Sequence, residues 1–169
     1  MKIEELHQIF LQCRSVCTDT RKIQKNDLFF ALKGDNFNGN TYANYALKLG
    51  AKYAIIDDTE FDVSEETILV NNALDALQKL ASFHRNYLKV PILAITGSNG
   101  KTTTKELINI ILSQNYKTTA TIGNLNNHIG VPLTLLSMTK DTEIGIVEMG
   151  ANHQKEIEFL CSIAQPDYG

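Results

Sequence analysis

The sequence predicts an α/β protein made of a small N-terminal α/β unit over residues 1–88 and a parallel-sheet unit over residues 89–169. Two observations predict this class. Apolar runs of strand length alternate with segments of helical periodicity, which favours parallel strands joined by helical crossovers. The pattern also restarts after a polar connection at residues 86–91, where a new apolar strand leads into a glycine-rich loop.

The first unit is predicted from apolar spacing and from helix start and stop signals. Apolar residues at helical spacing predict the first helix, Gly50 is a natural C-terminal stop for the second, and Asn72 is a good N-cap for the third. Short apolar runs between them predict strands. The helices are expected at residues 3–13, 42–49 and 72–84, and the strands at 15–18, 28–32, 53–56 and 68–70. Residues 34–40 are polar and turn-rich.

The second unit is predicted as alternating strands and helices. Its strands are expected at residues 92–96, 117–121 and 144–149, and its helices from about 102 onward, at 133–136 and at 155–163. The first of these helices carries an apolar stripe of Leu107, Ile108, Ile110, Ile111 and Leu112. This order is typical of a parallel sheet with helical crossovers.

The segment T-G-S-N-G-K-T-T at residues 96–103 predicts a phosphate-binding loop, because it lies between a strand and a helix. Glycines let the backbone turn tightly and point its N–H groups at phosphate oxygens, and a helix N-terminus attracts the same anion. Lys101 would reach the β- and γ-phosphates, and Thr102 would place its hydroxyl on Mg²⁺. The expected nucleotide-binding residues are Gly97, Ser98, Asn99, Gly100, Lys101, Thr102 and Thr103. Ile95 stands where the general P-loop pattern has its first glycine, so this is a variant loop.

Polar residues follow two further strands of this unit. Glu148 ends an apolar strand, and a carboxylate at this edge of an α/β sheet faces the ligand crevice, where it could share Mg²⁺ with Thr102. Asn124, Asn126 and Asn127 follow another strand, where amides could orient phosphate oxygens or simply form a turn. Of these three we take Asn127 as the best catalytic candidate.

The loop variant T-G-x-x-G-K-T resembles that of the Mur ligase family, whose members use ATP to form amide bonds. Further segments are similar to family segments in the same order: D-T-R at 19–21, L-F-F-A-L-K-G at 28–34, G-N-L-N-N-H-I-G-V-P-L-T at 123–134 and E-M-G-A-N-H at 148–153. The last two resemble the member that acts last in the series, on UDP-N-acetylmuramoyl-tripeptide and D-alanyl-D-alanine. Nearly the whole chain is covered by the resemblance.

The resemblance implies a UDP-substrate domain at residues 1–88, followed by the first part of a P-loop ATPase domain at residues 89–169. It implies acyl transfer through an acyl phosphate during peptidoglycan precursor synthesis, with ATP and Mg²⁺ as cofactors and with Lys101, Glu148 and Asn127 as catalytic residues. Elements that the family carries later in the chain are absent here. We therefore expect a truncated chain with uncovered apolar edges and no activity alone, and a monomeric full-length enzyme.

The same resemblance implies that the first unit binds the UDP-linked substrate. The expected contacts are Thr18, Asp19, Thr20, Arg21, Lys33, Gly34, Asn40 and Thr41. Two alternatives stay open here. Asp19 and Arg21 could form a purely structural ion pair, and residues 33–41 could be an ordinary surface turn. Asn38 and Asn40 stand where relatives often carry Asp and His.

Composition excludes several other classes. The net charge of −3 gives no general reason to bind nucleic acid, and no apolar run reaches the roughly 18 residues that span a bilayer. The N-terminus does not resemble a signal peptide, and three cysteines without metal-like partner pairs fit a reducing compartment, so we expect a cytoplasmic protein. Another Mur-type ligase, a non-catalytic nucleotide-binding module and a GTPase-type switch remain as alternatives.

Overall fold

The computed structural model describes residues 1–169, which divide into two compact units, Met1–Leu77 and Gln78–Gly169. The boundary falls inside helix α3 (Ala73–Leu88), whereas the sequence predicts the division at the C-terminal end of that helix. Both units combine helices with parallel strands, so the predicted α/β class is confirmed. None of the helices combines the length and the apolar character that crossing a bilayer requires.

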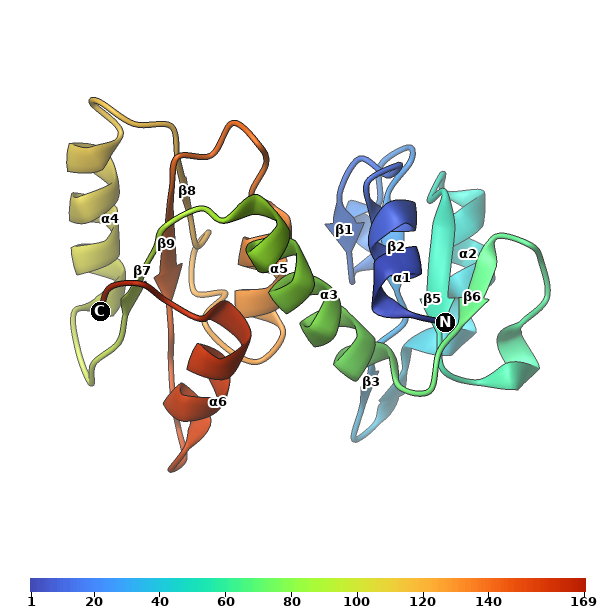
Figure 1. Ribbon diagram of the computed structural model, residues 1–169. Coiled ribbons are helices and arrows are strands. Elements are labelled where there is room, and N and C mark those ends of the chain that lie inside the picture. Colours follow the sequence, from blue (N-terminus) through green and yellow to red (C-terminus); the bar gives the residue numbers. More distant parts are fainter. The chain divides into compact units, whose positions relative to one another are not determined.

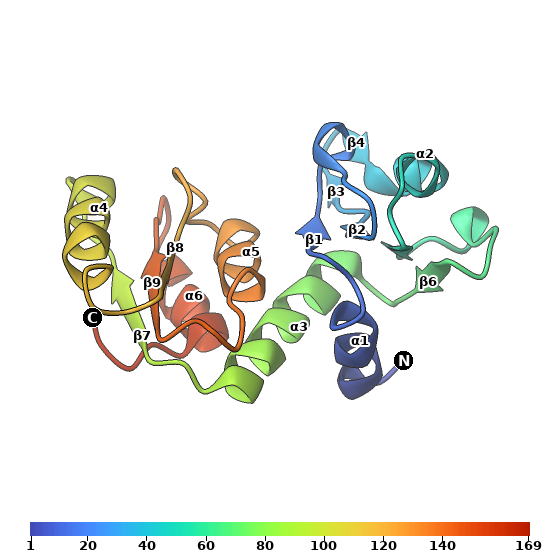
Figure 2. The same cartoon turned by 90° about the horizontal axis from the view of Figure 1, so that it is seen from above.

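The first unit is built on a four-stranded parallel sheet in the order β1-β2-β5-β6. Its strands are β1 (Val16–Cys17), β2 (Leu28–Phe30), β5 (Tyr53–Ile56) and β6 (Thr67–Leu69). Figure 2 shows helix α1 (Ile3–Phe10) on one face of this sheet and helix α2 (Ala43–Lys48) on the other. Covered on both faces, the central strands are almost continuously apolar, as is typical of parallel sheets.

A small hairpin in the first unit replaces the polar turn that the sequence predicts. Strands β3 (Lys33–Gly34) and β4 (Phe37–Asn38) pair antiparallel, and a short 3-10 helix, η2 (Gly39–Tyr42), follows them. Two further 3-10 helices, η1 (Thr20–Lys22) and η3 (Thr59–Phe61), lie elsewhere in this unit. These elements are short and mostly polar, so they carry neither an apolar run nor a helical periodicity, which explains why the sequence does not reveal them.

The second unit contains a three-stranded parallel sheet in the order β7-β9-β8. The strands are β7 (Ile92–Ile95), β8 (Thr118–Ala120) and β9 (Ile144–Glu148). Figures 1 and 2 show α4 (Lys101–Leu112) on one face and α5 (Gly130–Leu136) with α6 (Glu156–Ala164) on the other. Because the strands are parallel, their C-terminal ends meet at one edge, the edge at which α/β sheets bind ligands.

Helix α4 buries less of its predicted apolar stripe than the sequence suggests. Leu107, Ile110 and Ile111 are 57%, 58% and 67% exposed, whereas Lys105 is fully buried. The face of α4 that meets the sheet carries positions 105, 108 and 112, which share one side of a helix. Apolar surface is therefore uncovered on this helix, and a charged side chain occupies its buried face.

Candidate functional site

The glycine loop connects β7 to α4, the context that the sequence predicts. Gly97 and Gly100 have φ of 149° and 75°, conformations that residues with side chains rarely adopt. The loop is exposed, including Ser98 and Asn99, and Thr103 is exposed in the first turn of α4. Lys101 begins α4, and its Nζ donates to the carbonyl oxygen of Gly97 at 2.7 Å. An ammonium, loop N–H groups and a helix N-terminus thus lie together, an arrangement that attracts phosphate.

Glu148 is a buried carboxylate beside this loop. It ends β9, where it pairs with Ile95, and only 1% of it is exposed. Its Oε1 accepts hydrogen bonds from Thr102 Oγ1 at 3.2 Å and from Asn126 Nδ2 at 2.8 Å. Its Oε2 is buried without any hydrogen-bond partner. A buried carboxylate oxygen without a donor is costly, so the site suits a cation.

The chemistry of this site limits which cation it would suit. No group of three or more His, Cys, Asp or Glu side chains is placed to hold a metal ion. One carboxylate and one hydroxyl fit Mg²⁺, which takes its remaining ligands from phosphate oxygens and water. Thr102 and Glu148, the two residues predicted as metal ligands, are brought together by the fold.

Asn126 and Asn127 have different contacts, although they are neighbours in the sequence. The Asn126 amide donates to Glu148, and its backbone carbonyl accepts from the N–H of Gly150 at 2.8 Å. The Oδ1 of Asn127 instead accepts from the N–H groups of Ile129 and Gly130 at the start of α5. Asn126 is therefore the amide that contacts the carboxylate, and Asn127, which the sequence favours as the catalytic candidate, contacts the start of α5.

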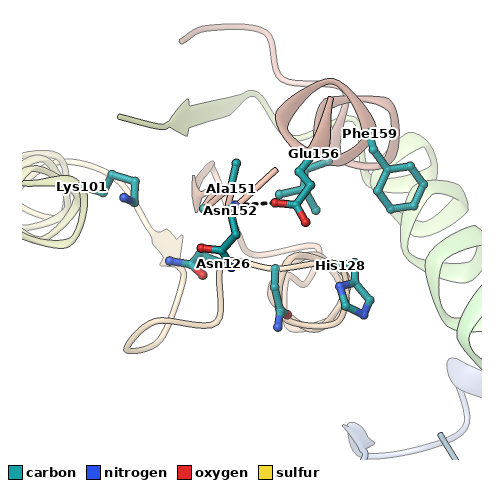
Figure 3. A pocket seen from close by; sticks show the side chains of 10 residues that line it. Lys101, Asn126, His128, Ala151, Asn152, Glu156 and Phe159 are labelled. Carbon is teal, nitrogen blue, oxygen red and sulfur yellow. Dashed lines mark hydrogen bonds between the residues drawn. The ribbon is translucent and has the colours of Figure 1, made fainter. Parts of the chain in front are cut away.

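A pocket of about 420 Å³ opens beside Lys101 and the Asn126 loop. Its lining residues are Lys101, Asn126, Asn127, His128, Gly150, Ala151, Asn152, Glu156, Phe159 and Leu160. Figure 3 shows Lys101 and Phe159 at opposite sides of the pocket, with Asn126 and Asn152 between them. Glu156 accepts hydrogen bonds from the N–H groups of His153 and Asn152, which lower the pKa of its carboxyl. The pocket thus has a basic end at the loop, while its α6 side combines the Glu156 carboxylate with apolar Phe159 and Leu160.

A second pocket, of about 490 Å³, lies in the first unit. It is lined by Thr18, Asp19, Thr20, Arg21, Phe29, Phe37 and Tyr42, which include four of the eight predicted substrate residues. Phe37 and Tyr42 stack at 5.4 Å between ring centroids, and they are 54% and 41% exposed. Neither aromatic residue is among the predicted substrate contacts, although one aromatic side chain within a polar turn and another just after it are a signal that could have indicated them.

Asp19 and Arg21 form a two-point ion pair at this second pocket. Arg21 Nε and one terminal nitrogen donate to the two carboxylate oxygens of Asp19 at 2.9 and 2.8 Å. The Arg21 side chain, followed by its backbone N–H, lowers the pKa of Asp19 to about 2. Because the Arg21 side chain is 87% exposed, the pair holds a guanidinium at the surface of the pocket.

The other four predicted substrate residues do not line this pocket. Lys33 Nζ pairs with Asp57 at 2.8 Å, which raises the pKa of Lys33, and Gly34 lies in β3. The Asn40 amide is fully buried between Asn38 and Asp57, and it accepts the Asp57 N–H at 3.0 Å. Thr41 Oγ1 donates to the carbonyl oxygen of Asn38. Their contacts fasten the hairpin to the end of β5.

The models of two protein-family domains match the chain. "Mur ligase family, catalytic domain" matches residues 12–85, and "Mur ligase middle domain" matches residues 95–169. Together they cover both units.

Curated relatives are about 40% identical to the chain over the aligned residues. A UDP-N-acetylmuramoyl-tripeptide–D-alanyl-D-alanine ligase of Bacillus subtilis is 42% identical over 154 residues, which are 90% of this chain and 34% of the relative. The ligase of the same name from Escherichia coli is 39% identical over 163 residues, which are 96% of this chain and 36% of the relative. The chain therefore spans about a third of the length of these relatives.

Solved structures that are similar to this chain include ligases of the same kind. A crystal structure of MurF from Acinetobacter baumannii superposes with a TM-score of 0.85 at 33% identity, over 98% of this chain and 38% of that one. The MurF ligase of Thermotoga maritima, solved in complex with ADP, superposes with a TM-score of 0.80 at 34% identity, over 94% of this chain and 36% of that one.

Proposed function

Because this chain belongs to the Mur ligase family, we propose that it forms the UDP-substrate and nucleotide-binding parts of a ligase that joins D-alanyl-D-alanine to UDP-N-acetylmuramoyl-tripeptide. The relatives that carry this name share about 40% of their residues with it over nine tenths of its length. Such an enzyme would act in the cytoplasm, on soluble precursors of peptidoglycan. The buried Glu148 carboxylate beside the phosphate loop is the observation that carries the proposal.

ATP would bind at the glycine loop, with its β- and γ-phosphates at the N-terminus of α4. The ADP complex of the Thermotoga maritima ligase, similar over 94% of this chain, supports a nucleotide in this protein. Lys101 would exchange its bond to the Gly97 carbonyl for bonds to phosphate oxygens. Its charge would then offset the charge that develops on the transferred phosphoryl group.

Mg²⁺ would be held by Glu148 and by the hydroxyl of Thr102. The unpaired Oε2 of Glu148 supplies the negative oxygen that such a cation needs, and Asn126 fixes the carboxylate through Oε1. When bound, Mg²⁺ would neutralise charge on the β- and γ-phosphates. Thr102 and Asn126 keep the carboxylate oriented for this role in the absence of a ligand.

The pocket beside Lys101 is suited to the reacting carboxylate. A carboxylate oxygen of the tripeptide would attack the γ-phosphorus of ATP, forming an acyl phosphate and releasing ADP. The amine of D-alanyl-D-alanine would then attack the acyl carbon, and the tetrahedral intermediate would expel phosphate as the amine loses a proton. Lys101 and the loop amides would bring two anions together, which is the main obstacle to the first step. Asn127 lines this pocket, and with its Oδ1 used by α5, its Nδ2 remains a donor for a substrate oxygen.

The pocket of the first unit is proposed to take the UDP part of the substrate. Arg21 presents a planar guanidinium that suits a diphosphate. The stacked pair of Phe37 and Tyr42 offers an aromatic surface to a flat ring. Lys33 and Asn40 would then support this site through their contacts with Asp57 instead of through direct substrate contacts.

The test is phosphate release from ATP by the full-length protein. The reaction would contain UDP-N-acetylmuramoyl-tripeptide, with and without D-alanyl-D-alanine, beside a Lys101→Ala variant. The proposal predicts release only with both substrates and its collapse in the variant. Release with a single amino acid would assign the protein to another ligase of the family. Nucleotide binding without any release would leave a non-catalytic nucleotide-binding module.

A further inference from the structure

Lys105 is a lysine buried in the second turn of α4, one turn beyond Lys101. None of its surface is exposed. Its Nζ donates to the carbonyl oxygens of Thr121 at 2.6 Å and of Gly123 at 3.2 Å, and it pairs with Glu106 Oε1 at 2.7 Å. An ammonium has three N–H bonds, and here each has an acceptor. A buried charge is costly to keep, so its contacts identify what it holds in place.

The bond to Thr121 lies at the point where β8 separates from β9. The N–H of Thr121 still donates to the carbonyl oxygen of Ile146, as a parallel ladder requires. The next bond of such a ladder would run from the N–H of Glu148 to the carbonyl oxygen of Thr121. That N–H donates instead to the hydroxyl of Thr121 at 2.9 Å, while the ammonium of Lys105 takes the carbonyl. Lys105 thus occupies the acceptor that would continue the ladder.

This junction is directly connected to the candidate cation site. The backbone N–H of Glu148 is the donor that bonds to the Thr121 hydroxyl in place of the Thr121 carbonyl. The carboxylate of the same residue is the proposed ligand of Mg²⁺. The segment that leaves β8 at Thr121 passes Gly123, whose carbonyl Lys105 also holds, and leads to Asn126. Asn126 in turn donates to the Glu148 carboxylate. One ammonium therefore fixes residues 121–123, the segment that contacts Glu148 through the Thr121 hydroxyl and leads to Asn126.

We propose that Lys105 is a positioning residue for the magnesium–nucleotide site, which it sets by holding β8 and β9 apart at Thr121 and by fastening the loop that carries Asn126. The inference rests on the proposed function, because it takes Glu148 as the cation ligand. A neutral side chain of similar length would leave the Thr121 and Gly123 carbonyls without this donor. The ladder could then extend to Thr121, and the Asn126 loop would lose its attachment to α4.

The test compares Lys105→Met with Lys117→Met in the full-length protein. Both variants replace a lysine of the second unit by the same neutral side chain, but Lys117 is exposed. Binding of ADP would be measured by calorimetry over a range of Mg²⁺ concentrations, and thermal unfolding would be measured without ligand. Loss of an outer-shell partner typically lowers metal affinity or activity by about 10–100-fold. We expect a weakening of that size in the magnesium-dependent part of ADP binding for Lys105→Met, and none for Lys117→Met.

The two measurements distinguish a positioning role from a purely structural role. If Lys105 were only structural, its replacement would lower the unfolding temperature without changing how ADP binding depends on Mg²⁺. A folded Lys105→Met with unaltered magnesium dependence overturns the proposal. If Lys105→Met does not fold, Thr121→Val tests the same junction, since it removes the hydroxyl that accepts the Glu148 N–H and the Thr134 hydroxyl but keeps the carbonyl that Lys105 contacts. Unaltered magnesium dependence in that variant would then overturn it. ADP binding is independent of turnover, so a wild-type protein that binds ADP but forms no amide bond would contradict the ligase assignment alone.

Discussion

The contact between Asn126 and Glu148 gives the sharpest single prediction. Asn126→Ala removes the 2.8 Å donor to Oε1 of a carboxylate that is 1% exposed. Only Thr102, at 3.2 Å, would then donate to that oxygen, and Oε2 has no donor. Hydrogen bonds to charged groups contribute roughly 1.5–3 kcal/mol, so the free energy of unfolding should fall by about that amount. Magnesium-dependent ADP affinity should fall by about 10–100-fold, because the carboxylate is no longer held in one orientation.

Two assays on the full-length protein would measure these effects: urea unfolding, and calorimetric titration of ADP with and without Mg²⁺. Asn115→Ala is the matched control, because it makes the same substitution in an exposed connection of the second unit. Asn127→Ala should lower stability by about 1 kcal/mol through loss of the bonds at the start of α5, without changing magnesium dependence. Equal results for Asn126→Ala and Asn115→Ala in both assays would show that the Asn126 amide does not hold the Glu148 carboxylate.

Three further predictions follow from other contacts. Gly150→Ala would place a Cβ 2.9 Å from the Asn126 side chain, so it should weaken magnesium-dependent ADP binding in a titration, and unchanged affinity would contradict this packing. Burial lowers the pKa of His84 below 6.5, so on acidification the unfolded state takes up a proton before the folded state does. The free energy of unfolding, measured with urea, should therefore fall as the pH drops below 6.5, and it should fall less steeply in His84→Gln. Arg21→Ala should return the pKa of Asp19 from about 2 toward 3.8 in an NMR titration and weaken binding of the UDP-linked substrate, and a pKa that stays near 2 would refute the assigned cause.

The phosphate loop could be predicted from the sequence because its chemistry depends on residue types at fixed spacing. Glycines before a lysine, between an apolar strand and a helix, leave few other structures for residues 96–103. The pairing of Thr102 with Glu148 was predictable for a similar reason, because parallel strands bring their C-terminal ends to one edge. The strands of both sheets were likewise predictable from short apolar runs, and most helices from their periodicity.

The remaining contacts depend on tertiary packing, which a periodicity pattern does not contain. Asn126 and Asn127 are neighbours of the same residue type, and only their tertiary contacts show that Asn126 holds the Glu148 carboxylate while Asn127 holds the start of α5. Lysines are almost never fully buried, so a lysine on an amphipathic helix is assigned to solvent, and Lys105 goes unnoticed. The inward direction of the Asn40 amide depends on Asp57, which lies at the end of another strand.

The origin of the oxygen atoms in the released phosphate shows directly whether the substrate carboxylate is activated as an acyl phosphate. The tripeptide substrate would carry oxygen-18 in its reacting carboxylate, and phosphate formed by the full-length protein with ATP and D-alanyl-D-alanine would be examined by mass spectrometry. An acyl phosphate intermediate transfers one carboxylate oxygen to each phosphate, so we expect one oxygen-18 atom per phosphate released. Phosphate without the label would contradict activation of the carboxylate at the Lys101 loop.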